Sequence, residues 1–172
     1  MAECEPFTGE FLHAIDSKSR LIIPSKLRDA ICPREQATAF YALAEYDGAL
    51  CLYTPEVYRA RSPSFEPEDL ADPDVRNFQR LYYSMSERVE VDRIGRVLLP
   101  ERLLRRCGIK KSVAILGGRD HIEVWDERKW KEWADEKFPT RDALAARVRN
   151  RRRVPEPPPA AAAPEAPGDP GR

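Results

Sequence analysis

The sequence predicts an α+β protein made of two pseudo-equivalent repeats, each with the order β-β-α-β-β-α, that share a small β-barrel. The main observation is an internal repeat, because the stretch DSKSRLIIP at residues 16–24 returns 76 residues later as DRIGRVLLP at 92–100. Asp, Arg and Pro keep their register in both copies, and the same hairpin and helix signals follow each copy. With 172 residues in all, each half is too small to bury a core alone, so we expect the halves to share one.

The first repeat is predicted to occupy residues 5–62. Pro24 lacks an N–H, so it is placed to end the strand after the first Asp–Arg turn and to open a short helix. Asp47-Gly48 between two apolar runs is typical of a hairpin. Thr54-Pro55 is typical of an N-cap followed by proline at the first helical position. The expected elements are strands at 7–15 and 21–23, a helix at 24–31, strands at 41–43 and 50–53, and a helix at 55–58.

A connector with one helix (63–85) and the second repeat (86–138) follow. Asp72-Pro73 starts the connector helix, whose apolar side chains gather close to one face. Trp130 and Trp133 stand at helical spacing in the last helix, which indicates a core or a subunit interface. The other expected elements are strands at 88–91 and 97–99, a helix that ends at Gly108, strands at 113–116 and 121–125, and a last helix capped by Asp126.

The segment 139–172 differs in character from the repeats. Residues 141–148 are predicted to extend a helix, and an arginine cluster occupies residues 147–153. From Pro155 the chain is rich in Pro and Ala, and residues 154–172 are expected to be disordered because such a segment buries little apolar area. Two interpretations of the basic cluster remain open: a solvated tail, or a weak, sequence-independent contact with phosphates.

Charge and hydropathy exclude several classes of protein. Lys plus Arg and Asp plus Glu both number 29, so the net charge favours no class of partner. Between Arg88 and Lys111, however, eight basic residues outnumber three acidic ones, which can build a basic face on a neutral protein. No stretch approaches the roughly 20 apolar residues of a membrane span, and the N-terminus lacks the apolar segment of an export signal. We therefore expect a cytoplasmic protein with no membrane partner.

The sequence shows no pattern of catalytic or metal-binding residues. His13 and His121 read as isolated strand residues, and no nucleophile–base pair, paired carboxylates or metal-ligand spacing stands out. We expect no enzyme activity, no cofactor and no metal. The cysteines form no C-x-x-C pair, which favours reduced thiols over disulfides or a zinc site. They are Cys4, Cys32, Cys51 and Cys107.

The doubled turn resembles the paired D-x-x-x-R motifs of the bacterial MraZ family. Gly9-Glu10, Asp72-Pro73-Asp74, the stretch RLYYS at 80–84 and the ending at 122–125 match this family too, so the resemblance covers about residues 5–137. The family is similar in fold to AbrB-type swapped-hairpin DNA-binding proteins. The resemblance implies a nucleoid-associated repressor that assembles into a ring. It also implies binding to direct repeats in the promoter of the division and cell-wall gene cluster, which includes its own gene.

The chemistry of the turns is compatible with DNA binding. A two-stranded ribbon or paired turns can enter the major groove of duplex DNA. Arg20 and Arg96 can reach guanine O6 and N7 bidentately, with about 1–3 kcal/mol of discrimination. Lys18, Arg28 and Arg93 are expected to contact phosphates and set the register. Arg102, Arg105 and Arg106 face either solvent or phosphate.

The remaining motif residues are expected to shape the turns. Asp16 and Asp92 should pair with the motif arginines, because a carboxylate that faces phosphate is repelled. Gly95 allows a positive φ at the second turn, and Pro100 ends the second strand as Pro24 ends the first. A purely structural role for the arginines stays open as well.

Two questions follow from the first copy of the motif and from the resemblance. Ser19 stands where the family usually has glycine; if that position needs φ > 0, serine costs about 1 kcal/mol of strain, and otherwise the turn takes another shape. The rival function is a protein-interaction or antitoxin-type module without operator specificity. In that case, charge reversal at Arg20 and Arg96 would disturb a protein complex and leave the DNA affinity unchanged.

Overall fold

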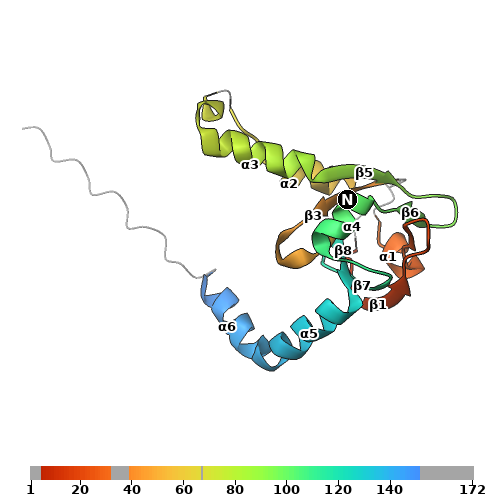
Figure 1. The fold of residues 1–172 in the computed structure, drawn as a ribbon. Helices are drawn as coiled ribbons and strands as arrows, with labels where there is room; N and C mark the ends of the chain where they lie inside the picture. Colours follow the sequence, from red (N-terminus) through yellow and green to blue (C-terminus); the bar gives the residue numbers. More distant parts are fainter. Residues whose placement is uncertain (1–4, 32–38, 67, 152–172) are drawn as a thin grey trace, which may run out of the picture. The chain divides into compact units, whose positions relative to one another are not determined.

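The computed structural model describes residues 5–31, 39–66 and 68–151, drawn in Figure 1. The chain divides into two compact units, Met1–Trp133 and Ala134–Arg172. The strands are β1 (Glu10–Ala14), β2 (Arg20–Ile22), β3 (Ala39–Ala44), β4 (Leu50–Tyr53), β5 (Ser86–Glu90), β6 (Arg96–Leu98), β7 (Ser112–Gly117) and β8 (His121–Asp126). The helices are α1 (Ser25–Asp29), α2 (Pro55–Arg61), α3 (Pro73–Ser84), α4 (Glu101–Cys107), α5 (Glu127–Lys137) and α6 (Arg141–Arg151), with short 3-10 turns at Tyr46–Gly48, Asp69–Ala71 and Phe138–Thr140.

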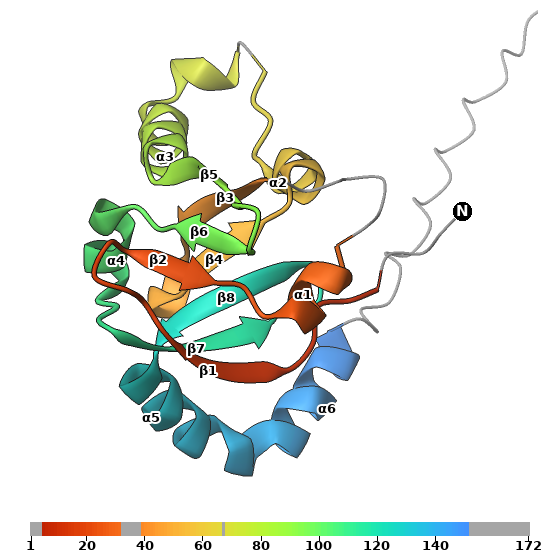
Figure 2. The same cartoon turned by 90° about the vertical axis from the view of Figure 1, so that its right-hand side faces the viewer.

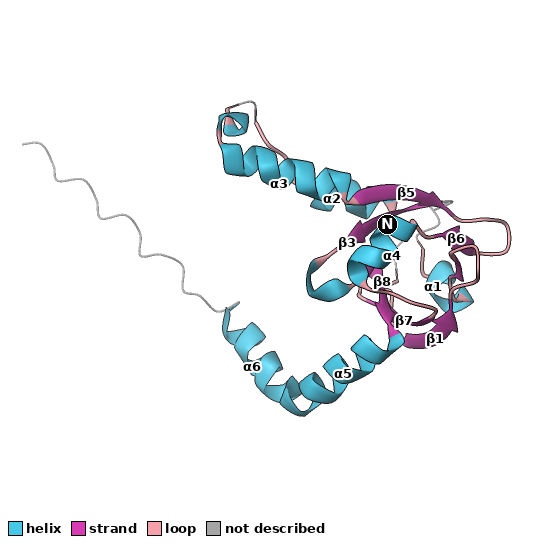
Figure 3. Cartoon of the chain, viewed as in Figure 1, coloured by secondary structure: helices cyan, strands magenta, loops and turns pink. Residues whose placement is uncertain are grey.

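Six strands form one antiparallel sheet in the order β1-β7-β8-β4-β3-β5. The first strand of each repeat pairs with a hairpin of the other repeat, β1 with β7 and β5 with β3. Exchanging the repeats leaves the order unchanged, so a pseudo-twofold axis passes between β4 and β8. The α+β class, the β-β-α-β-β-α order and the swapped hairpins are thereby confirmed (Figure 3).

The barrel expected from the sequence is not closed. Among the described strands, no ladder joins the edge strands β1 and β5. Each edge strand turns instead into a separate two-stranded ribbon, β2 paired with β6, which lies between the two edges in Figures 1 and 2. The ribbon therefore spans the gap that a closed barrel would have filled.

The ribbon joins the two copies of the repeated motif. Leu21 pairs with Val97 at its centre, and these residues are 76 positions apart. Beyond each strand, the backbone of one copy bonds to the turn of the other: the Ile23 N–H donates to the Gly95 carbonyl at 2.9 Å, and the Leu99 N–H donates to the Ser19 carbonyl at 2.8 Å. The two turns are thus held in one symmetrical unit by backbone hydrogen bonds.

The core lies on both faces of the six-stranded sheet because successive strand residues point to opposite faces. One apolar cluster packs the inner face against the ribbon and against α1 and α4; among its members are Leu21, Val97, Leu27 and Leu103. The other packs the outer face against aromatic side chains, including Tyr58 of α2 and Trp130 of α5. The ribbon is therefore anchored through its inward side chains.

Helix ends follow the sequence signals. The Thr54 hydroxyl accepts from the Val57 N–H at 3.4 Å, and the Asp72 carboxylate accepts from the Asp74 N–H at 2.8 Å. Gly108 ends α4 with φ +65°, which suits glycine. Asp126 directly precedes α5, but its Oδ2 accepts from the Lys110 N–H at 3.2 Å, so its role as the cap of α5 stays a prediction.

The start of the first strand differs from the sequence prediction. The first strand begins at Glu10 rather than Phe7, because Gly9 takes φ +104° and interrupts the extended chain. The expectations for Cys4, Cys32, Arg152, Arg153 and the segment 154–172 lie outside the described residues. Within the described part of the chain, no helix is both long and apolar enough to traverse a bilayer.

Candidate nucleic-acid interface

The first turn is built around the carboxylate of Asp16. Its Oδ1 accepts from the backbone N–H groups of Lys18 and Arg20 at 2.8 and 3.0 Å. Its Oδ2 accepts from the Arg20 Nε at 2.7 Å. One carboxylate thus closes the turn and holds the side edge of the guanidinium.

The second turn repeats this geometry. Oδ1 of Asp92 accepts from the N–H groups of Ile94 and Arg96 at 3.0 and 2.9 Å, and Oδ2 accepts from the Arg96 Nε at 2.7 Å. The ion pair expected from the sequence is present in both copies. The carboxylate thus binds the Nε edge of the guanidinium in both copies, and in the first copy a terminal nitrogen of Arg20 also lies 2.7 Å from Oδ2 of Asp16.

These contacts lower the pKa of both aspartates. The Arg20 side chain, together with the Arg20 backbone N–H, lowers the pKa of Asp16 to about 2. The backbone N–H of Arg96, followed by its side chain, lowers the pKa of Asp92. Both carboxylates are therefore ionised at neutral pH, and each carries the charge that orients its arginine.

Ser19 adopts the left-handed conformation, with φ +58°, as Gly95 does with φ +83°. The first turn has therefore kept its shape, and of the two alternatives left open by the sequence the strained serine is the one observed. Arg28 explains why the second copy needs glycine more strictly. A Cβ on Gly95 would lie 2.7 Å from Nε and Cζ of Arg28, and the Arg28 Nε donates to the Ile23 carbonyl at 3.1 Å.

The outward face of the ribbon carries the motif arginines. Leu21 and Val97 are fully buried, so their strand neighbours point the other way. Ile22, 46% exposed, lies opposite Arg96, and Leu98, 60% exposed, lies opposite Arg20. The two arginines thus stand diagonally across one face, with an exposed aliphatic side chain opposite each.

The other predicted contact residues surround this face in different ways. Lys18 and Arg93 are exposed at the tips of the two turns. Arg28 is half-buried against the second turn, so it supports the turn as well as carrying charge. Pro24 and Pro100 directly precede α1 and α4, so each copy passes from ribbon to helix at its proline. The structure therefore gathers the predicted residues into one region, apart from the partial burial of Arg28.

Two arginines of α4, Arg102 and Arg105, are engaged with the protein itself. Arg102 donates to the carbonyls of Ser84 and Ser86 and pairs with Glu87 at 3.0 Å. It thereby ties α4 to the end of α3 and the start of β5. Arg105 forms an exposed pair with Glu101 at 3.3 Å. For Arg102, the structure favours a structural role over either alternative considered from the sequence.

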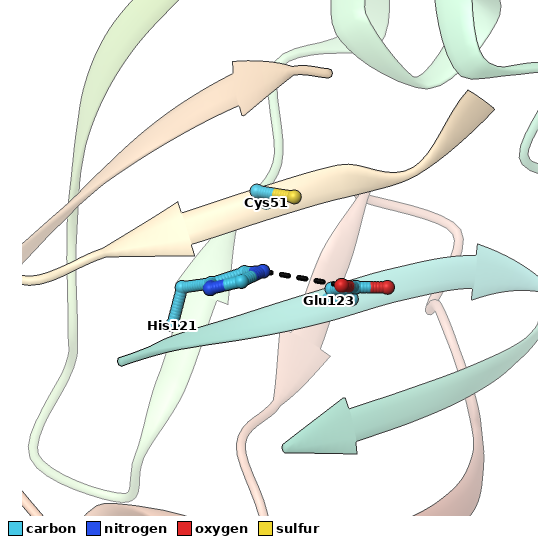
Figure 4. A group of neighbouring side chains, drawn as sticks. All are labelled: Cys51, His121 and Glu123. Carbon is cyan, nitrogen blue, oxygen red and sulfur yellow. Dashed lines mark hydrogen bonds and ion pairs between the residues drawn. The ribbon is translucent and has the colours of Figure 1, made fainter. Parts of the chain in front are cut away.

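His121 is not the isolated strand residue that the sequence suggested, and that expectation is wrong. Its Nδ1 lies 2.7 Å from Oδ1 of Asp120, and its Nε2 lies 3.1 Å from Oε1 of Glu123. Burial alone would lower the pKa of His121, but hydrogen bonds to Glu123 and Asp120 raise it above its usual value. Cys51 lies beside the pair (Figure 4). The period-two spacing of His121, Glu123 and Trp125 was the available signal for a shared face.

Comparison with known proteins places this geometry in a family context. A family model described as "MraZ protein, putative antitoxin-like" matches residues 83–151. The chain is 31% identical over 142 residues to the transcriptional regulator MraZ of Heliobacterium modesticaldum, an alignment that covers 83% of this chain and 96% of the relative. It is 32% identical to that of Acetivibrio thermocellus with the same coverage. It is 36% identical to that of Symbiobacterium thermophilum over 74% of this chain and 89% of the relative.

Proposed function

The chain belongs to the MraZ family of transcriptional regulators, and we propose that it binds promoter DNA sequence-specifically as a repressor. The proposed target is the division and cell-wall gene cluster that includes its own gene, read as short direct repeats by a ring of identical subunits. The expectation that the chain is not an enzyme is confirmed, because its relatives are regulators. Such a protein would be associated with the nucleoid.

The observation that carries the proposal is the pair of turns, closed by the same aspartate hydrogen bonds, on one ribbon. Arg20 and Arg96 are each held along the Nε edge by an aspartate, at 2.7 Å in both copies. A guanidinium oriented in this way loses little side-chain entropy when it binds a guanine edge. Two-stranded ribbons fit the major groove of B-DNA. In the proposed complex each carboxylate would hold its arginine in place while the arginine contacts the base.

The spacing of the arginines fits base pairs that lie about two steps apart. Diagonal neighbours across an antiparallel pair stand about 7–8 Å apart, whereas successive base pairs rise about 3.4 Å. Arg20 and Arg96 would therefore address bases about two steps apart. The exposed side chains of Ile22 and Leu98 lie opposite these arginines and suit contact with thymine methyl groups.

An exposed apolar helix face supports assembly into a ring. On α3, Phe78 is 42% exposed and Leu81 is 63% exposed, and no residue of this helix is buried. Apolar side chains at helical spacing that stay uncovered in one subunit are suited to an interface with the next. Identical subunits side by side would present identical ribbons, and several weak contacts with successive direct repeats would add to one another.

Fluorescence anisotropy with the DNA upstream of the protein's own gene, compared with a shuffled duplex, tests this function. We expect tight binding to the upstream DNA alone, and a loss of that preference in Arg20→Ala and Arg96→Ala. Arg128→Ala serves as the control, because Arg128 is an exposed arginine whose partner, Glu132, lies on the same helix. The affinity should fall steeply with salt, because phosphate contacts release counterions.

The rival function is a protein-binding module of the antitoxin type, since the matching family is described as antitoxin-like. It predicts equal, weak binding to both duplexes and no effect of Arg20→Ala or Arg96→Ala on DNA affinity. That result would refute operator binding and direct attention to a protein partner.

A further inference from the structure

We infer that Cys51, His121 and Glu123 form a site for one Zn²⁺ ion that joins the two repeats. The sulfur of Cys51, a ring nitrogen of His121 and a carboxylate oxygen of Glu123 all lie within 4.8 Å of one another. Figure 4 shows the three side chains gathered on one side of neighbouring strands. Thiolate, imidazole and carboxylate are all zinc ligands, and a thiolate favours zinc over magnesium or calcium.

The central ladder of the sheet brings these residues together. Strand β4 of the first repeat pairs with β8 of the second, with Cys51 directly opposite Glu123 and Tyr53 opposite His121. His121 and Glu123 are two residues apart, so they share a face of β8. The ligands thus come from both repeats and meet beside the pseudo-twofold axis, where a bound ion would link the two halves.

The hydrogen bonds of His121 place one ring nitrogen where a metal ion can bind. A neutral imidazole carries one N–H, and the 2.7 Å contact of Nδ1 with Asp120 uses it. Nε2 then presents a lone pair to a carboxylate oxygen of Glu123 only 3.1 Å away. Two facing lone pairs repel, so this contact requires a proton or a metal ion.

Neighbouring residues hold the three side chains in the manner of an outer coordination shell. Oδ2 of Asp120 binds Arg61 at 2.8 Å while Oδ1 holds His121. The indole N–H of Trp125 donates to Oε2 of Glu123 at 2.7 Å, so the other carboxylate oxygen, Oε1, faces His121. A carboxylate on the far nitrogen of a ligating histidine is the usual companion of zinc sites.

The geometry needs only a small contraction. In a tetrahedral zinc site with bonds of 2.0–2.3 Å, ligand atoms stand about 3.3–3.8 Å apart, so the widest separation must shrink by about 1 Å. A surface cavity of ≈ 280 Å³ adjoins all three side chains. It gives the ion a path of entry and leaves room for water as the fourth ligand.

Binding also changes the protonation of the site. Burial, with the nearby charges of Glu123 and Glu45, raises the pKa of the Cys51 thiol far above its usual value. A divalent ion reverses both causes, because it compensates the carboxylates and bonds directly to sulfur. Cys51 then loses its thiol proton to solvent as the Zn–S bond forms, so binding should release protons.

The test uses the full chain, stripped with a chelator and titrated with Zn²⁺ against a chromophoric competitor. We expect one ion per chain, loss of that binding in Cys51→Ser and His121→Gln, and about 10–100-fold weaker binding in Asp120→Asn. Cys107→Ser is the matched control, because Cys107 is also a free, buried cysteine but lies outside the cluster. Stoichiometric binding that survives Cys51→Ser and His121→Gln would overturn the inference, as would no binding by the wild type.

A spectroscopic measurement on the wild type avoids any variant that fails to fold. Co²⁺ in place of Zn²⁺ should give a thiolate-to-metal charge-transfer band, and ¹⁵N NMR should show His121 Nε2 bound to metal. If His121 instead remains a doubly protonated imidazolium with equimolar Zn²⁺ present, the proton alone explains the short contact and the site is refuted.

Discussion

Replacing Gly95 by serine is expected to destabilise the protein by about 2 kcal/mol. Gly95 has φ +83°, and a Cβ there would lie 2.7 Å from the Arg28 side chain. Arg28 must then move, which breaks the 3.1 Å hydrogen bond from its Nε to the Ile23 carbonyl. The substitution thus adds backbone strain and displaces a side chain that supports the turn.

The magnitude follows from three terms. A left-handed conformation costs a residue with a side chain about 1–2 kcal/mol. Loss of a hydrogen bond costs about 0.5–1.5 kcal/mol. Serine restricts the unfolded chain more than glycine does, and this reduces the loss of stability by about 0.4–1 kcal/mol. Ser19→Gly is the matched control in the first turn. The counterpart of Arg28 there is Leu104, 76 positions later, which lines the same surface cavity as Ser19. Ser19→Gly should change the free energy of unfolding by less than about 1 kcal/mol.

Urea unfolding followed by tryptophan fluorescence measures both variants, at two protein concentrations so that assembly is accounted for. Arg28→Ala combined with Gly95→Ser completes a double-mutant cycle, and the combined cost should be smaller than the sum of the single costs. Equal unfolding midpoints for the wild type and Gly95→Ser would refute the reasoning.

Three further predictions concern other parts of the fold. The lowered pKa values of Asp16 and Asp92 stabilise the folded state above pH 4, and this contribution should disappear as the pH falls from about 4 to 2. Asp92→Asn should flatten that part of the curve of unfolding free energy against pH. An unchanged curve would contradict the ion pair. Leu21→Ala, at a fully buried position, should lower the free energy of unfolding in urea by about 2–5 kcal/mol. Ile22→Ala, at the exposed neighbouring position, should lower it by less than about 0.5–1 kcal/mol. Equal losses would contradict the assigned faces of the ribbon. Leu81→Glu on the exposed face of α3 should lower the oligomeric state in sedimentation velocity, and an unchanged assembly would exclude this face as the interface.

The repeated motif carried most of what could be predicted. A constant offset of 76 residues relates Leu21 to Val97 at the centre of the ribbon, and the same offset relates the two aspartate-closed turns. Helix starts at Thr54 and Asp72 were also evident, because a capping residue followed by proline acts over a few residues only. Local signals and internal symmetry were thus sufficient for the elements and for the candidate arginines.

Long-range pairing was beyond reach of these signals. Cys51 lies opposite Glu123 only because β4 pairs with β8, and two residues 72 positions apart share no local pattern. The contact of Arg28 with Gly95 likewise depends on how one repeat packs on the other. The open sheet has the same origin, since closure depends on where the ribbon lies between β1 and β5.

Base reading by Arg96 is the central claim, and Arg96→Lys tests it most directly. Lysine keeps the positive charge but lacks the planar guanidinium, so it cannot be held by Asp92 through Nε and present a second, fixed edge to guanine at the same time. The measurement is the ratio of affinities for upstream and shuffled DNA at one salt concentration. We expect the ratio to fall about 5–150-fold, the equivalent of about 1–3 kcal/mol, while the affinity for shuffled DNA stays the same. An unchanged ratio would contradict base reading and would leave Arg96 as a structural partner of Asp92.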